Sequence, residues 1–83
     1  MPMITIRVLR VDAVTRTGPR GAFQAYCVTG SEGADWDMGT FQAQTTSDVA
    51  ASLCERAKAL DRTLSVLWKD GRYGREIVTL DLT

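Results

Sequence analysis

The stretch that decides the fold is residues 4–14, which read ITIRVLRVDAV. Its apolar residues fall first on one alternate set of positions and then on the other: Ile4, Ile6 and Val8, followed by Leu9, Val11 and Ala13. Because successive side chains of a strand point to opposite faces, one flat strand cannot place both sets in one core. One extra residue near Val8 and Leu9 repairs the conflict. The stretch therefore predicts a bent strand whose halves belong to two sheets, as in a small, partly open barrel.

Length and charge limit the possible classes. A chain of 83 residues is expected to form a single domain, residues 1–83. Its ten basic and ten acidic side chains cancel, so there is no general attraction to nucleic acid or to membranes. No apolar run is long enough to span a bilayer, and we expect a cytoplasmic protein. Cys27 and Cys54 lie in apolar patterns and are expected as buried free thiols rather than a disulfide.

Glycine, proline and polar clusters divide the rest of the chain into elements. The pattern predicts strands over residues 22–29, 36–45, 63–69 and 75–82 and a helix from about 47 to 60. Residues 15–21 and 30–35 are expected to be loops, with a bulge or bend at Gly39. In the first hairpin the pairs expected to face inward are Ala13 with Phe23, Val11 with Ala25 and Leu9 with Cys27. Gln24 and Tyr26 then point outward.

The helix has a clear beginning. Ser47 is a good N-cap, and Asp48 suits the positive end of the helix dipole. Helical spacing predicts one narrow apolar face made of Val49, Leu53, Ala57 and Leu60. Phe41 and Ala43 of the strand before the helix are expected inward, together with Trp68 of the strand after it.

The last hairpin allows two registers. A turn at Asp70-Gly71 would set Trp68 opposite Tyr73. A five-residue loop over 70–74 would instead set Leu64 opposite Leu80 and Val66 opposite Val78. The second register matches apolar residues better and is preferred.

The order strand, strand, strand, helix, strand, strand, with a bent first strand, resembles the oligonucleotide/oligosaccharide-binding fold (OB-fold). The resemblance rests on topology and covers nearly the whole chain. It implies a mainly β, five-stranded barrel with one helix between strands three and four. The alternative is an α+β, ubiquitin-like β-grasp, which has two strands before the helix where three are predicted here. Residues 15–23 also resemble the first hairpin of small phage-type single-stranded DNA-binding proteins, which are all-β dimers.

Catalytic residues are scarce. The chain has no histidine, the commonest general base and metal ligand. Glu32, Asp35 and Asp37 match no calcium-loop spacing, and the loop glycines match no phosphate-loop pattern. We therefore expect no enzyme, no metal site and no cofactor.

Binding residues are more numerous. The OB-fold resemblance implies a ligand face on strands two and three, flanked by the loops joining strands one to two and four to five. Those loops, residues 15–21 and 69–75, hold the basic side chains Arg16, Arg20, Lys69, Arg72 and Arg75. Cations bind a phosphate backbone, and aromatic rings stack on bases. Tyr26 and Tyr73 are the expected stacking residues, with Trp36 a third candidate.

The sequence thus predicts a non-catalytic protein that binds single-stranded nucleic acid. The alternative is a protein-interaction module, or a subunit acting through an exposed strand edge or a homo-oligomer interface. Its basic loops and its acidic loop over 30–37 give the chain two oppositely charged ends, which suits self-association.

Overall fold

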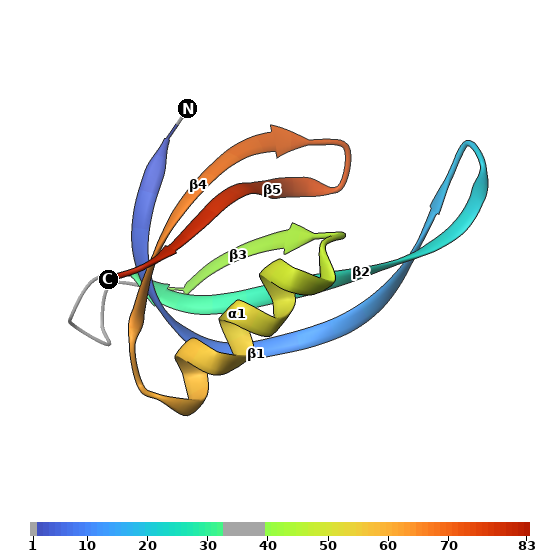
Figure 1. Cartoon of the computed structure of the whole chain (residues 1–83). Coiled ribbons are helices and arrows are strands. Elements are labelled where there is room, and N and C mark those ends of the chain that lie inside the picture. Colours follow the sequence, from blue (N-terminus) through green and yellow to red (C-terminus); the bar gives the residue numbers. More distant parts are fainter. Residues whose placement is uncertain (1, 33–39) are drawn as a thin grey trace.

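The computed structural model describes residues 2–32 and 40–83, and its five strands close in a ring in the order β1-β2-β3-β5-β4 (Figure 1). One helix lies between β3 and β4, so the predicted mainly β class and element order are confirmed. No helix in these ranges has the length and apolar character that crossing a bilayer requires. The elements are β1 (Met3–Gly18), β2 (Gly21–Glu32), β3 (Thr40–Thr45), α1 (Asp48–Ala59), β4 (Thr63–Gly71) and β5 (Gly74–Leu82). Trp36, Asp35, Asp37 and Gly39 lie outside the described residues.

The predicted break in β1 is present. The pairing of β1 with β2 changes register between Val8 and Arg10, which is where the apolar parity changes. Residues 3–7 pair with β4, and residues 6–18 pair with β2. One bent strand therefore serves both halves of the ring, as the sequence predicted.

Gly30 of β2 allows this bend. It pairs with Val8 beside the bulge. A Cβ atom at Gly30 would lie 2.8 Å from Cδ1 of Ile6 and 3.0 Å from the carbonyl oxygen of Arg7. Only a residue without a side chain lets the two strands approach this closely. Gly30 was expected in a loop, but β2 continues through Glu32.

The core lies inside the ring and under the helix. Its buried members are Ile6, Val8, Val28, Phe41, Ala43, Cys54, Ala57, Leu64 and Val66. The inward positions of Phe41 and Ala43 are confirmed, and Trp68 is half-buried against them. Phe23 was expected in the core but lies outside it.

The helix begins as predicted but presents a different face. Ser47 caps it by accepting a hydrogen bond from the Ala50 amide at 3.2 Å. The residues it buries are Ala51, Cys54 and Ala57, whereas Val49 is 80% exposed. The prediction of Val49 and Leu60 as core residues was wrong. The helix contacts the ring through small side chains, so the size of a residue decided which face of the helix is buried more than its hydrophobicity did.

The first hairpin is longer than predicted and shifted in register. β1 continues to Gly18, and the turn is only Pro19-Arg20, followed by Gly21 with φ of 106°. Ala25 faces Val14 rather than Val11, a shift of three residues. An odd shift exchanges the two faces of a strand. Val28, expected outside, is therefore fully buried.

The last hairpin also turns over two residues, Arg72-Tyr73, with Gly74 at φ of 106°. Neither predicted register was right. Val66 faces Leu80, two residues from the preferred expectation, and an irregularity follows between Leu67 and Trp68. An even shift keeps each residue on its predicted face, so Val66 is still in the core.

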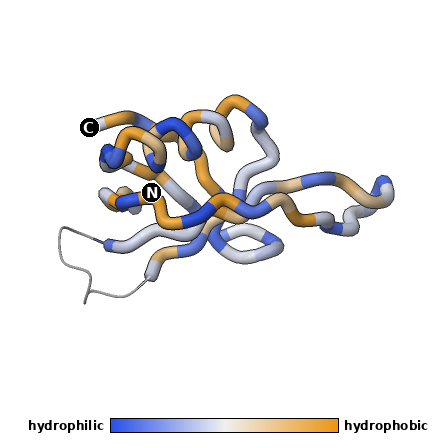
Figure 2. The backbone as a smooth tube through the Cα atoms, turned by 90° about the horizontal axis from the view of Figure 1, so that it is seen from below, coloured by the Kyte–Doolittle hydropathy of each residue, from blue (hydrophilic) through white to orange (hydrophobic). Residues whose placement is uncertain are grey.

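The molecule measures 40 × 24 × 20 Å because the turn end of the β1–β2 hairpin extends beyond the ring (Figure 1). We call this extension, residues 14–25, the arm. Figure 2 shows that the arm alternates in hydropathy and ends in a hydrophilic tip. Arg20 is at that tip.

Candidate nucleic-acid interface

Tyr73 joins the two hairpins. From the β4–β5 turn its hydroxyl donates a hydrogen bond to the carbonyl oxygen of Thr17 in the arm. Its ring packs edge-to-face on Phe23, with centroids 6.0 Å apart at an interplanar angle of 62°. The two arginine-bearing hairpins therefore lie against one another, although they are far apart in the sequence.

Two arginines are stacked on the same tyrosine. The guanidinium carbons of Arg16 and Arg72 each lie 5.7 Å from the centre of the Tyr73 ring. The Nε of Arg16 also donates to Oε1 of Gln44 at 3.3 Å. Cation–π contacts hold a guanidinium in place while leaving its N–H groups free to donate elsewhere. The Tyr73 ring therefore positions two arginine side chains and is not left as an uncovered surface for stacking.

A third arginine lies over the next pair of rings. Arg75 is 5.0 Å from the centre of Phe41 and 4.9 Å from the centre of Trp68. Those rings pack on each other at 6.0 Å and belong to the core or its border. The core therefore fixes the position of the Arg75 guanidinium.

Two of the three arginines, Arg16 and Arg75, line a small polar pocket of about 160 Å³, together with Tyr73. Arg16, Arg75, Gln42 and Gln44 supply its polar side chains, and Cys27 borders it from β2. Guanidinium and amide N–H groups are donors for a phosphate oxygen. The pocket lies on β2 and β3 between the two turns, where the OB-fold resemblance implied a ligand face.

The predicted cations form no ion pair with a carboxylate in the described part of the chain. Within residues 2–32 and 40–83 the ion pairs are Arg7 with Asp61 and Arg10 with Asp12. None of the five predicted cations is among them. Asp70 and Glu76 face Arg75 and Lys69 across the hairpin, but neither carboxylate forms an ion pair with any residue that the structure describes. Arg20 and Lys69 are exposed and extend the basic surface at its two ends.

Tyr26 does not join this surface. Its hydroxyl donates to Oδ1 of Asp48 at 2.7 Å, and this hydrogen bond raises the pKa of Tyr26. It lines a hollow with Val11 and Ala51, on the helix side of β2. The sequence placed it outward on the ligand face, and the register shift of the first hairpin puts it on the other side.

Several residues of the site were not predicted as ligand contacts. Gln42 and Gln44 were placed outward on strand three, and Phe23 was assigned to the core. Alternation along residues 41–45 was the signal that placed the two glutamines on the face opposite Phe41 and Ala43, although Gln44 is itself buried there. Nothing local in the sequence shows that Phe23 would meet Tyr73, because their contact depends on how the ring closes.

The structure also shows how the acidic and thiol side chains are placed. In the part of the chain that it describes, no three histidine, cysteine, aspartate or glutamate side chains are grouped to hold a metal ion. Both cysteines are free thiols. Burial, and then the charge of Glu55, raise the pKa of Cys54 to about 11, so this thiol stays protonated at neutral pH.

The chain matches no protein-family model, no curated protein and no solved structure.

Proposed function

We propose that the protein binds single-stranded nucleic acid without catalysing a reaction. The observation that carries the proposal is the group of three arginines, Arg16, Arg72 and Arg75, held on aromatic rings without ion-pair partners in the described ranges. Residues 15–24 and 69–76 contain five basic side chains and two carboxylates, so charge is concentrated here in a chain of zero net charge. Phosphates along a strand require such a row of cations.

The ring topology supports the same proposal. The strand order, the bent first strand and the helix after β3 resemble an OB-fold, and that resemblance implies an oligonucleotide crossing β2 and β3 between the two turns. The small pocket lined by Arg16 and Arg75 lies on that path. The aromatic rings there position cations, so affinity depends chiefly on phosphate contacts and only weakly on stacking.

A salt titration of a fluorescent oligo-dT tests the proposal. With about four phosphates neutralised, log affinity falls with log salt at a slope of about −3. Replacing both Arg16 and Arg72 by alanine reduces the slope by about 0.7 for each arginine. Arg56→Ala, which removes an exposed cation from α1, is the matched control and leaves the slope unchanged. Absence of binding at low salt, or equal losses in the control, would refute the proposal.

A second candidate function is docking of a protein strand. β5 pairs with β3 at Gln44 and Glu76 alone in the described ranges, so its edge beyond Glu76 is open. An open edge can accept a strand from a partner or a second copy. Light scattering coupled to size exclusion tests self-association, and a monomer at every concentration excludes the homo-oligomer.

A further inference from the structure

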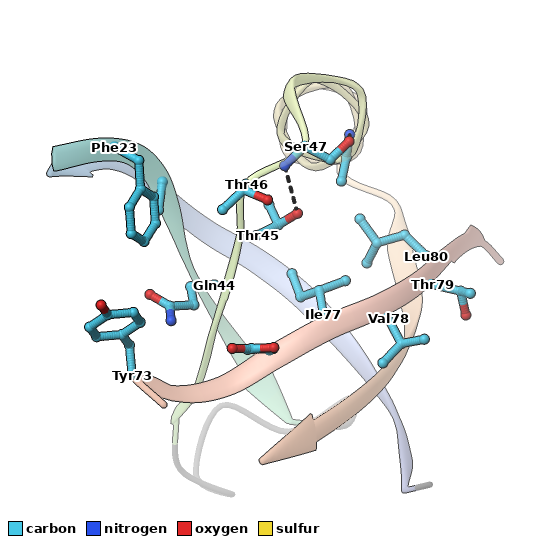
Figure 3. Close-up of a pocket in the computed structure, with 13 residues that line it drawn as sticks. Phe23, Gln44, Thr45, Thr46, Ser47, Tyr73, Ile77, Val78, Thr79 and Leu80 are labelled. Carbon is cyan, nitrogen blue, oxygen red and sulfur yellow. Dashed lines mark hydrogen bonds between the residues drawn. The ribbon is translucent and has the colours of Figure 1, made fainter. Parts of the chain in front are cut away.

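A second, larger pocket lies beside the arginine group, with a volume of about 450 Å³. Ligand pockets for small molecules are typically about 300–1,000 Å³. The pocket is bordered by the arm, by the end of β3 and the beginning of α1, and by β5. In Figure 3 Phe23 and Tyr73 face each other at one end, and Ile77 and Leu80 lie toward the other. The walls are therefore aromatic and aliphatic.

Two of the polar side chains that line the pocket belong to neighbouring strands and are paired. In the described ranges Gln44 and Glu76 are the one pair that joins β3 to β5. Glu76 is the only charged residue of the lining and has no hydrogen-bond or ion-pair partner in the described ranges. Glu76 is half-buried, and both oxygens of its carboxylate can accept hydrogen bonds from a ligand in the pocket.

Gly71 accounts for the position of the carboxylate. A Cβ atom at Gly71 would lie 2.2 Å from Cδ of Glu76. The glutamate side chain therefore occupies the space that any other residue at position 71 would need. With glycine at position 71, the Glu76 carboxylate can lie over this residue, and there it borders the pocket.

The hydrogen-bonding direction of Gln44 is also set. Its Oε1 accepts from Arg16, so its Nε2 remains as a donor. Side by side, Gln44 and Glu76 offer an amide NH₂ donor group and two carboxylate oxygens as acceptors. The Watson–Crick edge of guanine offers the complement: the O6 acceptor, the N1–H donor and the N2 amino donor. Adenine, cytosine and thymine each present a different order and leave at least one of these groups unmatched.

We propose that this pocket binds a guanine base of the single strand and makes the protein selective for guanine. The inference rests on the proposed function: Arg16 and Arg72 hold the neighbouring phosphates, and Tyr73 belongs to both sites. A base leaves the strand, enters between the aromatic and aliphatic walls, and presents its Watson–Crick edge to Gln44 and Glu76. The same mode of reading is used by proteins that bind unstacked bases.

The test uses a fluorescent oligo-dT and derivatives with one central thymine replaced by guanine, inosine, adenine or cytosine. A single guanine tightens binding by about 5- to 150-fold, the range of one bidentate pairing. Inosine, which lacks the N2 amino group, gives an intermediate gain. Adenine and cytosine give less than inosine.

Two variants assign the effect to the pocket. Glu76→Gln exchanges an acceptor for a donor and abolishes the guanine preference, while the loss of one negative charge raises the affinity for every strand alike. Gly71→Ala displaces the Glu76 carboxylate without changing charge and weakens the preference as well. Asp70→Asn removes the same charge from the same hairpin, does not touch the pocket, and keeps the preference.

Failure of this inference is distinct from failure of the proposed function. Salt-dependent binding of oligo-dT with no difference among the substituted strands overturns guanine selectivity alone. A guanine preference that survives Glu76→Gln also overturns it, because the selectivity then lies elsewhere. No binding of any strand overturns both proposals.

Discussion

Replacing Gly30 with alanine should destabilise the fold by about 1–3 kcal/mol, the usual cost of adding a methylene to a tightly packed site. The new methyl would lie 2.8 Å from Cδ1 of Ile6 and 3.0 Å from the Arg7 carbonyl oxygen. Ile6 is 1% exposed, so its side chain has no solvent to move into, and the carbonyl belongs to a paired strand. At about 4–8 °C per kcal/mol, the melting temperature falls by roughly 4–24 °C.

The contact responsible for the destabilisation can be identified by removing Cδ1 of Ile6, the atom closest to the new methyl group. Ile6→Val deletes Cδ1 and by itself costs about 0.5–1.5 kcal/mol. Combined with Gly30→Ala it should cost less than the sum of the two, by on the order of 0.5–1 kcal/mol, since one of the close contacts is gone. Urea unfolding of the four proteins at equal m-values gives the coupling. Additivity to within about 0.3 kcal/mol would refute the reasoning, because the clash would then not be with Ile6.

Two further predictions concern the helix and its buried thiol. Ser47→Ala removes the N-cap acceptor and should lower the free energy of unfolding in a urea titration by about 1 kcal/mol; an unchanged free energy would show that the Ser47 hydroxyl does not cap the helix. Cys54 should resist a thiol reagent that labels Cys27, until the protein is unfolded. Its pKa is raised from 9.0 to about 11 in the folded state, so the stability it contributes is complete below pH 9 and is lost as pH rises toward 11. This loss should be absent from Cys54→Ala, and an identical alkaline profile for the two proteins would contradict the assignment.

The ring could be predicted from the sequence because its main constraint is local. The change of apolar parity at Val8 and Leu9 requires a bulge, and the bulge is present. The cap at Ser47 is equally local, since it depends on one hydroxyl and one amide three residues later. Such signals do not depend on which strands meet across the ring.

Registers were harder because they depend on where each turn closes. Both turns are Gly-X-X-Gly, at 18–21 and at 71–74, and in both the second glycine has φ of 106°. This repeated pattern is the signal that the loop-length argument overlooked. The three-residue error in the first hairpin put Tyr26 on the wrong face in the prediction. The two-residue error in the last hairpin left Val66 on its predicted face.

The sequence predicted which charged residues lie near the two turns, but not which side chains contact one another there. Arginines near two turns can be counted in a sequence, but their stacking on Tyr73 follows from ring closure. Glu76 carried no sequence signal at all. Its place beside the pocket is seen only in the structure, where it lies over Gly71 and pairs with Gln44.

The sharing of β1 between β2 and β4 has a consequence for how the chain folds. The β1–β2 hairpin needs only a two-residue turn, and hairpins of this kind form in about 1–10 μs. Closing the ring requires Ile6 to meet Leu64, from opposite ends of the chain, and contacts this distant slow folding to milliseconds or longer. The hairpin is thus an early template, and the last step is the arrival of the C-terminal pair of strands on its free edge.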